Sequence, residues 1–161
     1  MAVAFTREED LEAAAAYLPE RPISPHRNLV TKLGLADLDA ALAAAQAAFT
    51  AAQLQGGIST NRSAMAQAAR DLRYYRARRA SAELVDRPAD PAVLQFGGSV
   101  TVDRADGRRQ TFRIVGEDEA DAGRGSVSYV SPLARALLGR SVGDVATVGG
   151  GEVEIVAILP G

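Results

Sequence analysis

The sequence predicts an α+β protein in which an N-terminal antiparallel helical hairpin precedes a small antiparallel β domain with one short helix. Two alanine-rich segments with helical spacing flank a tight turn at Gly56-Gly57. Residues 87–92, which hold two prolines, indicate a linker. Beyond them alanine becomes rarer, and short runs alternate between apolar and polar residues as in strands. These three observations give the predicted domains: helix and proline-rich strap 1–29, coiled-coil hairpin 30–86 with its tip near 55–61, linker 87–92 and β domain 93–161.

The overall composition excludes several classes of protein. The formal net charge of −2 provides no general attraction for nucleic acid or membranes. The absence of cysteine rules out disulfides, a thiol nucleophile and cysteine metal sites. No run approaches the roughly 20 apolar residues of a membrane span, and the first residues lack the apolar core of a signal peptide. We therefore expect a cytoplasmic protein.

The first segment combines a short helix with an extended strap. Thr6 and Glu9 have the spacing of a capping box, which predicts a helix to about Tyr17. Three prolines within residues 18–29 then favour an extended chain over a packed element. His26 lies in this strap and is expected to be a surface residue.

The two hairpin helices carry a heptad seam. Thr31 can cap the first helix, which is expected to end near Leu54. Its seam positions are Leu35, Leu38, Leu42, Ala45, Phe49 and Ala52, and those of the return helix are Met65, Ala68, Leu72, Tyr75 and Ala82. Arg79 falls on the seam and is expected to extend outward. The arginines of the return helix allow two interpretations, a solvated face or a surface for an acidic partner: Arg70, Arg73, Arg76, Arg78 and Arg79.

The β domain has clear turns between its strands. Residues 100–102 and 112–114 alternate with period two and are joined through Asp106-Gly107, a hairpin dipeptide. Further strands are expected at 127–129, 145–148 and 153–158, the last two separated by three glycines. Within residues 131–139, serine is the N-cap, proline occupies the first helical position and glycine ends the helix. Leu133 and Leu137 of this helix are expected to seal the sheet.

The second half resembles a known family. The segments that carry the resemblance are Phe96–Val102, Phe112–Asp121, Ser131–Gly139 and Val142–Asp144. In order and spacing they resemble the C-terminal domain of the GreA/GreB transcription elongation factors. The resemblance implies an FKBP-like fold for residues 93–161. It also implies that this domain docks at the rim of the RNA polymerase secondary channel while the coiled coil enters the channel.

The hairpin resembles the family in outline but departs from it at the tip. Cleavage-competent members carry an acidic pair there, which helps to hold a second Mg²⁺ for hydrolysis of backtracked RNA; Mg²⁺ favours such carboxylate ligands. The matching positions in this sequence are Gly57 and Thr60, and no Asp or Glu occurs from Ala40 to Arg70. The hairpin is also shorter than the familiar one by about seven or eight residues, or roughly 10–12 Å of reach at the rise of an α-helix.

We therefore expect a noncatalytic, Gre-like factor that binds RNA polymerase and regulates elongation without stimulating transcript cleavage, as an inhibitor or as a competitor of cleavage factors. It is expected to be a monomer without cofactor, metal or membrane contact, and to meet nucleic acid only indirectly, within the transcription complex. The resemblance implies polymerase docking through Ser131, Pro132, Ala134 and Arg135. The expected channel tip consists of Gly57, Ser59, Thr60, Asn61 and Arg62.

Other interpretations stay open at this point. The chain can be an interaction module like the regulator of nucleoside diphosphate kinase, which shares the C-terminal domain behind a shorter coiled coil. A peptidyl-prolyl isomerase is suggested only by analogy of fold, which is a weak argument for activity. The acidic residues within 117–121 can be read as a metal site or, preferably, as a solvated edge.

Overall fold

The structure, a computed structural model, describes residues 18–55, 60–86, 90 and 92–160. The expected helix at 6–17 lies outside this part. The chain divides into two compact units. We call residues 38–81, with the strap that precedes residue 26, the helical unit. Residues 26–37 and 82–161 form the globular unit. Residues 26–37 lie within the predicted strap and hairpin segments, yet they cluster with the globular part of the chain.

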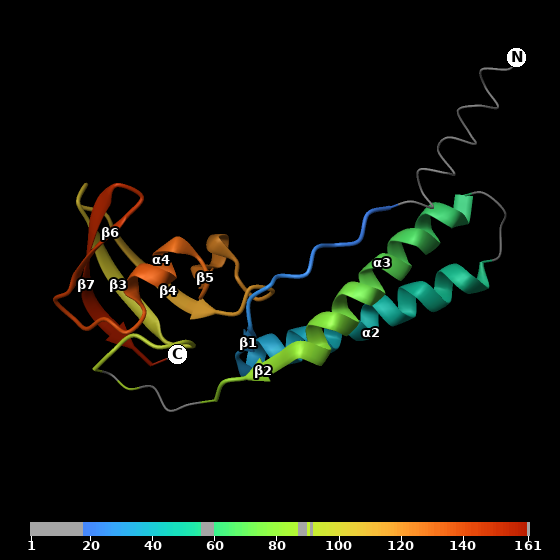
Figure 1. Cartoon of the computed structure of the whole chain (residues 1–161), viewed down its shortest axis with the longest axis horizontal. Helices are drawn as coiled ribbons and strands as arrows, with labels where there is room; N and C mark the ends of the chain where they lie inside the picture. Colours follow the sequence, from blue (N-terminus) through green and yellow to red (C-terminus); the bar gives the residue numbers. More distant parts are fainter. Residues whose placement is uncertain (1–17, 56–59, 87–89, 91, 161) are drawn as a thin grey trace, which may run out of the picture. The chain divides into compact units, whose positions relative to one another are not determined.

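Two long helices form the helical unit. Helix α2 (Lys32–Leu54) begins in the globular unit and continues into the helical unit, where α3 (Thr60–Ser81) runs alongside α2 (Figure 1). Their antiparallel arrangement follows from two contacts: Arg76 donates to Gln46 at 3.0 Å, and Arg79 pairs with Asp39 at 2.5 Å. From Arg76 to Arg79 the residue number increases along α3, while the residue contacted on α2 moves back from Gln46 to Asp39, as it does between antiparallel helices.

The predicted heptad seam is confirmed in the burial of the helices. On α2, Leu38, Ala45 and Ala52 are buried, and the alternate seam positions are half-buried. On α3, Ala68 and Leu72 are buried. Thr31 caps α2 as predicted, because its hydroxyl accepts the Gly34 amide at 3.0 Å. The described helices include none that is both long and apolar enough to cross a membrane.

The globular unit is built on a five-stranded sheet in the order β5-β4-β3-β7-β6. Its strands are β3 (Ser99–Arg104), β4 (Arg109–Val115), β5 (Ser126–Ser128), β6 (Val145–Val148) and β7 (Gly151–Leu159). A 3₁₀ turn, η1 (Ala122–Arg124), precedes β5, and α4 (Pro132–Leu137) follows it. The predicted α+β class is thereby confirmed.

The predicted turns are found, but one strand pairing differs. Gly107 between β3 and β4 and Gly149 and Gly150 between β6 and β7 all have positive φ, which glycine adopts without a Cβ clash. An antiparallel sheet was predicted throughout. That prediction is wrong at one edge, since β5 runs parallel to β4. A parallel neighbour needs a crossover connection, and here residues 116–125 and η1 supply it.

A second, two-stranded sheet was not predicted. β1 (Asn28–Val30) pairs in parallel with β2 (Ala82–Leu84). The strap prediction is therefore wrong for residues 28 and 29, which form strand and bury Asn28. Ala82, predicted as the last seam position of the return helix, also lies in strand, because α3 ends at Ser81. The helical hairpin is the crossover that this parallel pair requires.

Candidate docking site

Helix α4 belongs to the globular unit and begins with the N-terminal cap that the sequence predicts. The Ser131 hydroxyl accepts the Ala134 amide at 3.2 Å, and Pro132 occupies the first turn, where its missing N–H is not needed. Leu137 is fully buried, with Leu133 packed at the edge of the same core. The helix is thus fixed from below by apolar packing and at its start by a cap.

The four predicted docking residues differ in accessibility. Pro132 and Arg135 are exposed and Ser131 is half-buried. Ala134 is 0% exposed and belongs to the core cluster of the sheet. Its predicted role as a contact residue has to be corrected, because a partner cannot reach its side chain without unfolding the helix. Of the predicted docking residues, Pro132 and Arg135 are therefore the accessible ones, and Ser131 is accessible in part.

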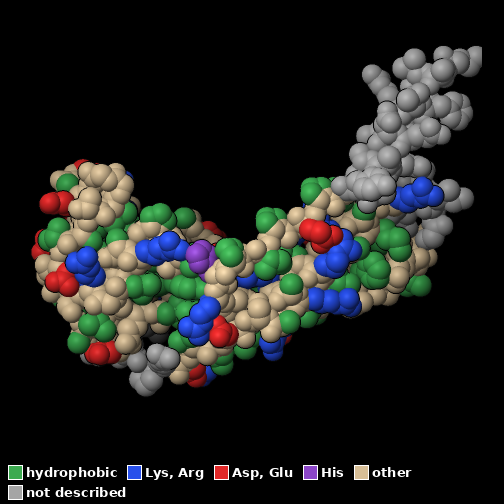
Figure 2. Space-filling view, in the orientation of Figure 1, with side chains coloured by type: hydrophobic (Ala, Val, Ile, Leu, Met, Phe, Trp, Pro, Cys, Tyr) green, Lys and Arg blue, Asp and Glu red, His purple; other side chains and the backbone are tan. Residues whose placement is uncertain are grey.

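Two residues beside α4 were not found by sequence reasoning. His26 Nε2 lies 3.4 Å from an Arg135 guanidinium nitrogen, and the histidine is visible in purple next to a basic side chain (Figure 2). The Tyr129 hydroxyl donates to the carbonyl of Arg27. These pairs join positions more than 100 residues apart in the chain, so no local pattern could reveal them. The end of the strap therefore lies beside the predicted docking residue Arg135.

Glu119 changes the interpretation of the acidic segment 117–121. It was expected to belong to a solvated edge, but its carboxylate accepts the Thr31 hydroxyl at the N-terminus of α2. A carboxylate is favoured there by the helix dipole and by the unpaired amides of the first turn. A Cβ on Gly34 would lie 2.8 Å from Glu119 Oε1, so a larger residue there would displace the end of the Glu119 side chain. Glu119 is an anchor for the start of α2.

The predicted tip lies largely outside the described residues. Gly57 and Ser59 are not described, while Thr60 and Asn61 begin the backbone of α3. Arg62 is exposed. Among the residues that the structure describes, no group of three His, Asp or Glu side chains could hold a metal ion.

Arginine and aspartate side chains of α3 form ion pairs with the strap. Arg73 binds the Glu20 carboxylate of the strap through two nitrogens, at 3.0 and 2.5 Å. The hydrogen bond from Arg73 holds the pKa of Glu20 below its usual value. Arg21 pairs with Asp71 at 3.2 Å and lies 3.8 Å from the centre of the Tyr74 ring. The strap therefore neutralises part of the surface that an acidic partner would use.

Arg78 and Arg79 do not both behave as solvated residues. Arg78 is 2% exposed, so its inclusion in a solvated basic face has to be corrected. Arg79 extends from the seam to the Asp39 carboxylate. Its position follows the predicted outward course of a long side chain, and the ion pair gives it a fixed end.

Comparison with known proteins found a family model that matches the C-terminal part of the chain. Residues 89–160 match the family model described as "Transcription elongation factor, GreA/GreB, C-term". Curated relatives named transcription elongation factor GreA come from Thioalkalivibrio sulfidiphilus, 46% identical over 80 residues, and Methylococcus capsulatus, 40% identical over 94 residues. These alignments cover 43% and 54% of this chain and 51% and 60% of the relatives, so the chain spans little more than half of their length.

Solved structures with some similarity also carry Gre-related names. One is the GreA factor homolog 1 (Gfh1) of Thermus thermophilus, with 23% sequence identity and a TM-score of 0.39. That comparison covers 83% of this chain and 99% of the Thermus protein.

Proposed function

We propose that the chain is a Gre-like regulator of transcription elongation that binds RNA polymerase, because residues 89–160 match the model of the GreA/GreB C-terminal domain. The observation that carries the proposal is the family match over the whole sheet and α4, together with the exposure of Pro132 and Arg135 on that helix. The finer proposal is docking of this surface at the rim of the secondary channel.

We further propose that the chain does not stimulate transcript cleavage. Its tip sequence has Gly57 and Thr60 where cleavage-competent members carry carboxylates, and residues 40–70 contain no acidic side chain that could replace them. Arg62 adds positive charge next to the tip, which disfavours a divalent cation. Without hard anionic ligands, a second Mg²⁺ has no protein site at the tip. We propose that the hairpin acts by obstruction or by competition with cleavage factors.

The reach of the hairpin supports the same proposal. Helix α2 has 23 residues, which at the rise of an α-helix corresponds to a length of about 35 Å. The shorter hairpin would keep the tip short of the position that the family's cleavage factors use. Restored carboxylates alone should therefore give little cleavage activity.

A binding experiment tests the partner. Core RNA polymerase is titrated with the full chain, with Arg135→Glu and with Arg124→Glu as a matched control on the exposed 3₁₀ turn of the same unit. We expect binding by the wild type and the control, and weakening of about tenfold or more for Arg135→Glu, the range that loss of a charged contact produces. Equal affinity of all three proteins would contradict docking through α4. Recovery of a metabolic enzyme without polymerase would favour the alternative interaction module.

A second experiment tests the mechanism on backtracked complexes with Mg²⁺. The wild-type chain should leave the RNA length unchanged and should slow shortening by an authentic GreA protein as its concentration rises. Shortening of the RNA by the chain alone would refute the noncatalytic proposal. The variant Gly57→Asp/Thr60→Glu separates the two causes, since a gain of cleavage would show that only the carboxylates were missing.

A further inference from the structure

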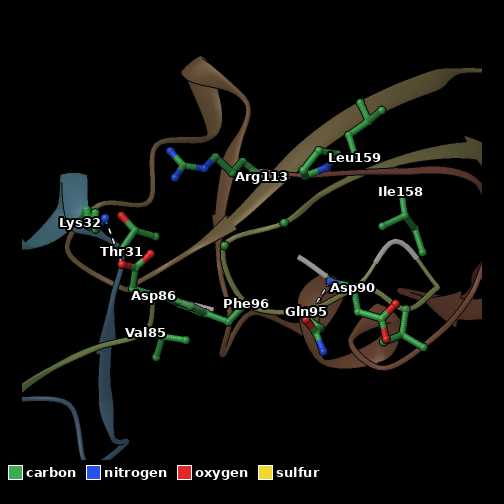
Figure 3. A pocket seen from close by; sticks show the side chains of 14 residues that line it. Thr31, Lys32, Val85, Asp86, Asp90, Gln95, Phe96, Arg113, Ile158 and Leu159 are labelled. Atoms are coloured by element: carbon green, nitrogen blue, oxygen red, sulfur yellow. Dashed lines mark hydrogen bonds and ion pairs between the residues drawn. The ribbon is translucent and has the colours of Figure 1, made fainter. Parts of the chain in front are cut away.

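A cavity of about 410 Å³ lies in the globular unit, and its described lining includes no residue of α4 (Figure 3). This volume falls within the range of roughly 300–1,000 Å³ that is usual for small-molecule sites. Its lining comes from the start of α2, the end of β2, the segment before β3, strand β4 and the end of β7. All of these belong to one compact unit, so the cavity does not depend on the placement of the hairpin.

Arg113 is the lining residue that points to a ligand. It extends from β4 toward the side of the cavity formed by Thr31 and Lys32 (Figure 3). Its Nε atom is buried and has no hydrogen-bond partner among the residues that the structure describes. A buried donor on a charged group is costly when it is unpaired, so proteins rarely leave one without a partner. Because the buried Nε is closed to solvent, a ligand in the cavity would meet the terminal nitrogens of the guanidinium instead.

The other polar side chains of the cavity have partners within the protein. Lys32 Nζ lies 2.9 Å from the Asp86 carboxylate, and the Thr31 hydroxyl is bound to Glu119. Asp90 accepts the Ala92 amide at 2.9 Å, while Gln95 accepts the amide of Asp90 at 3.3 Å. Among the described lining residues, Lys32 and Asp86 form an ion pair, whereas Arg113 and Asp90 each line the cavity without one.

The remaining wall is apolar and held in place. It consists of Val85, Val93, Phe96, Gly97, Gly98, Ile158, Leu159 and Pro160. The Phe96 ring meets the Tyr129 ring edge-on, with centroids 5.4 Å apart and an interplanar angle of 87°. Tyr129 is itself fixed by its hydrogen bond to Arg27. An aromatic wall that is already positioned loses little side-chain freedom when a ligand binds.

We propose that this cavity binds a small organic carboxylate whose apolar ring or chain lies against Phe96 and Val93. Arg113 donates to the carboxylate, which matches the planar guanidinium fork. Asp86 and Asp90 line the same cavity and repel additional negative charge, so a single carboxylate fits better than a polyphosphate. The described lining includes none of the proposed docking residues, and the inference does not rest on the proposed function.

The test is a calorimetric titration of the full chain with 2-naphthoate, compared with the neutral 2-naphthamide and with inorganic phosphate. We expect saturable binding of 2-naphthoate and binding at least about tenfold weaker for each of the other two compounds, since each lacks one of the two recognised features. Arg113→Gln should weaken 2-naphthoate binding by a similar factor. The control Arg124→Gln, which removes an exposed charge from the same unit, should bind like the wild type.

Two results would overturn the proposal. The first is absence of saturable 2-naphthoate binding to the wild type at millimolar concentration. The second is equal affinity of wild type and Arg113→Gln for 2-naphthoate. Amide NMR spectra report whether Arg113→Gln remains folded. If it does not, Val93→Asp keeps Arg113 and places a like charge in the apolar wall, and unchanged binding by that variant would equally contradict the site.

Discussion

In the globular unit the buried positions are filled mainly by branched aliphatic side chains, whereas in the described part of the helical unit they include three alanines, two leucines and one arginine. The globular core is dense, with Val100, Val102, Ile114 and Ile155 all 0% exposed. The helical seam is thin, because alanine buries little area but lets two backbones approach closely. One unit should therefore be sensitive to loss of volume and the other to added volume.

The largest expected effect comes from truncation in the globular core. Ile155→Ala removes a fully buried side chain from β7, the strand between β3 and β6, and should lower the free energy of unfolding by about 2–5 kcal/mol. Urea denaturation followed by amide NMR signals of β7 measures it. The control Val145→Ala, at a position 49% exposed, should change stability by less than about 0.5 kcal/mol. Similar values for both variants would contradict the dense core.

Enlargement of the helical seam should have the next largest effect. Ala45→Leu adds volume between α2 and α3 at a buried position and should destabilise the helical unit by about 1–3 kcal/mol. Circular dichroism at 222 nm during thermal unfolding reports the helices. The matched control is Ala47→Leu on the exposed side of α2, which should stay within about 0.5 kcal/mol of the wild type. A stabilised Ala45→Leu protein would show that the seam has spare room.

Loss of the α4 cap, in the globular unit, should have a smaller effect on stability. Ser131→Ala leaves the Ala134 amide without its side-chain acceptor and should cost about 1 kcal/mol. Ser131→Asp keeps an acceptor at the same position and should retain most of the stability. Denaturant midpoints of the three proteins decide between these outcomes. Equal loss in both variants would mean that the serine contributes by something other than capping.

The smallest expected effect concerns the strap of the helical unit. The pKa of Glu20 lies below its ordinary value of 4.5 because Arg73 donates to the carboxylate. The contact therefore stabilises the folded state above pH 4.5, and this contribution is lost as the pH falls through the lower folded pKa. Carbon NMR of the Glu20 carboxyl group measures the titration. Arg73→Gln should raise the midpoint toward the ordinary value, and an unchanged midpoint would exclude this ion pair in solution.

The sequence predicted the elements that depend on local chemistry. Thr31, Ser131 with Pro132, and Asp106-Gly107 each determine a cap or a turn from within a few residues, and the heptad seam determines which helix faces meet. Each of these was found at its predicted position. The family resemblance, which rested on segments in the same region, was likewise confirmed for residues 89–160.

The contacts between distant segments were not predictable in this way. The parallel pairing of β1 with β2 needs a crossover of about 50 residues, and nothing in Asn28–Val30 indicates its partner. The burial of Ala134 was missed because its place within the docking motif suggested a surface role. The sequence around Arg113 does not indicate a binding role, because the lack of an ion pair depends on which carboxylates the fold places beside it. The cavity therefore became visible only in the structure.

The pairing of β1 with β2 also has a consequence for the order of folding. Because the globular unit contains residues 26–37 as well as 82–161, its chain is interrupted by the whole hairpin. Forming the β1–β2 pair closes a loop of this length, an entropic cost that falls once the hairpin has brought both ends together. We expect the helices to form first and the small sheet afterwards. A fragment that begins at residue 89 would lack β1, β2 and the partner of Glu119, and would have to fold without them.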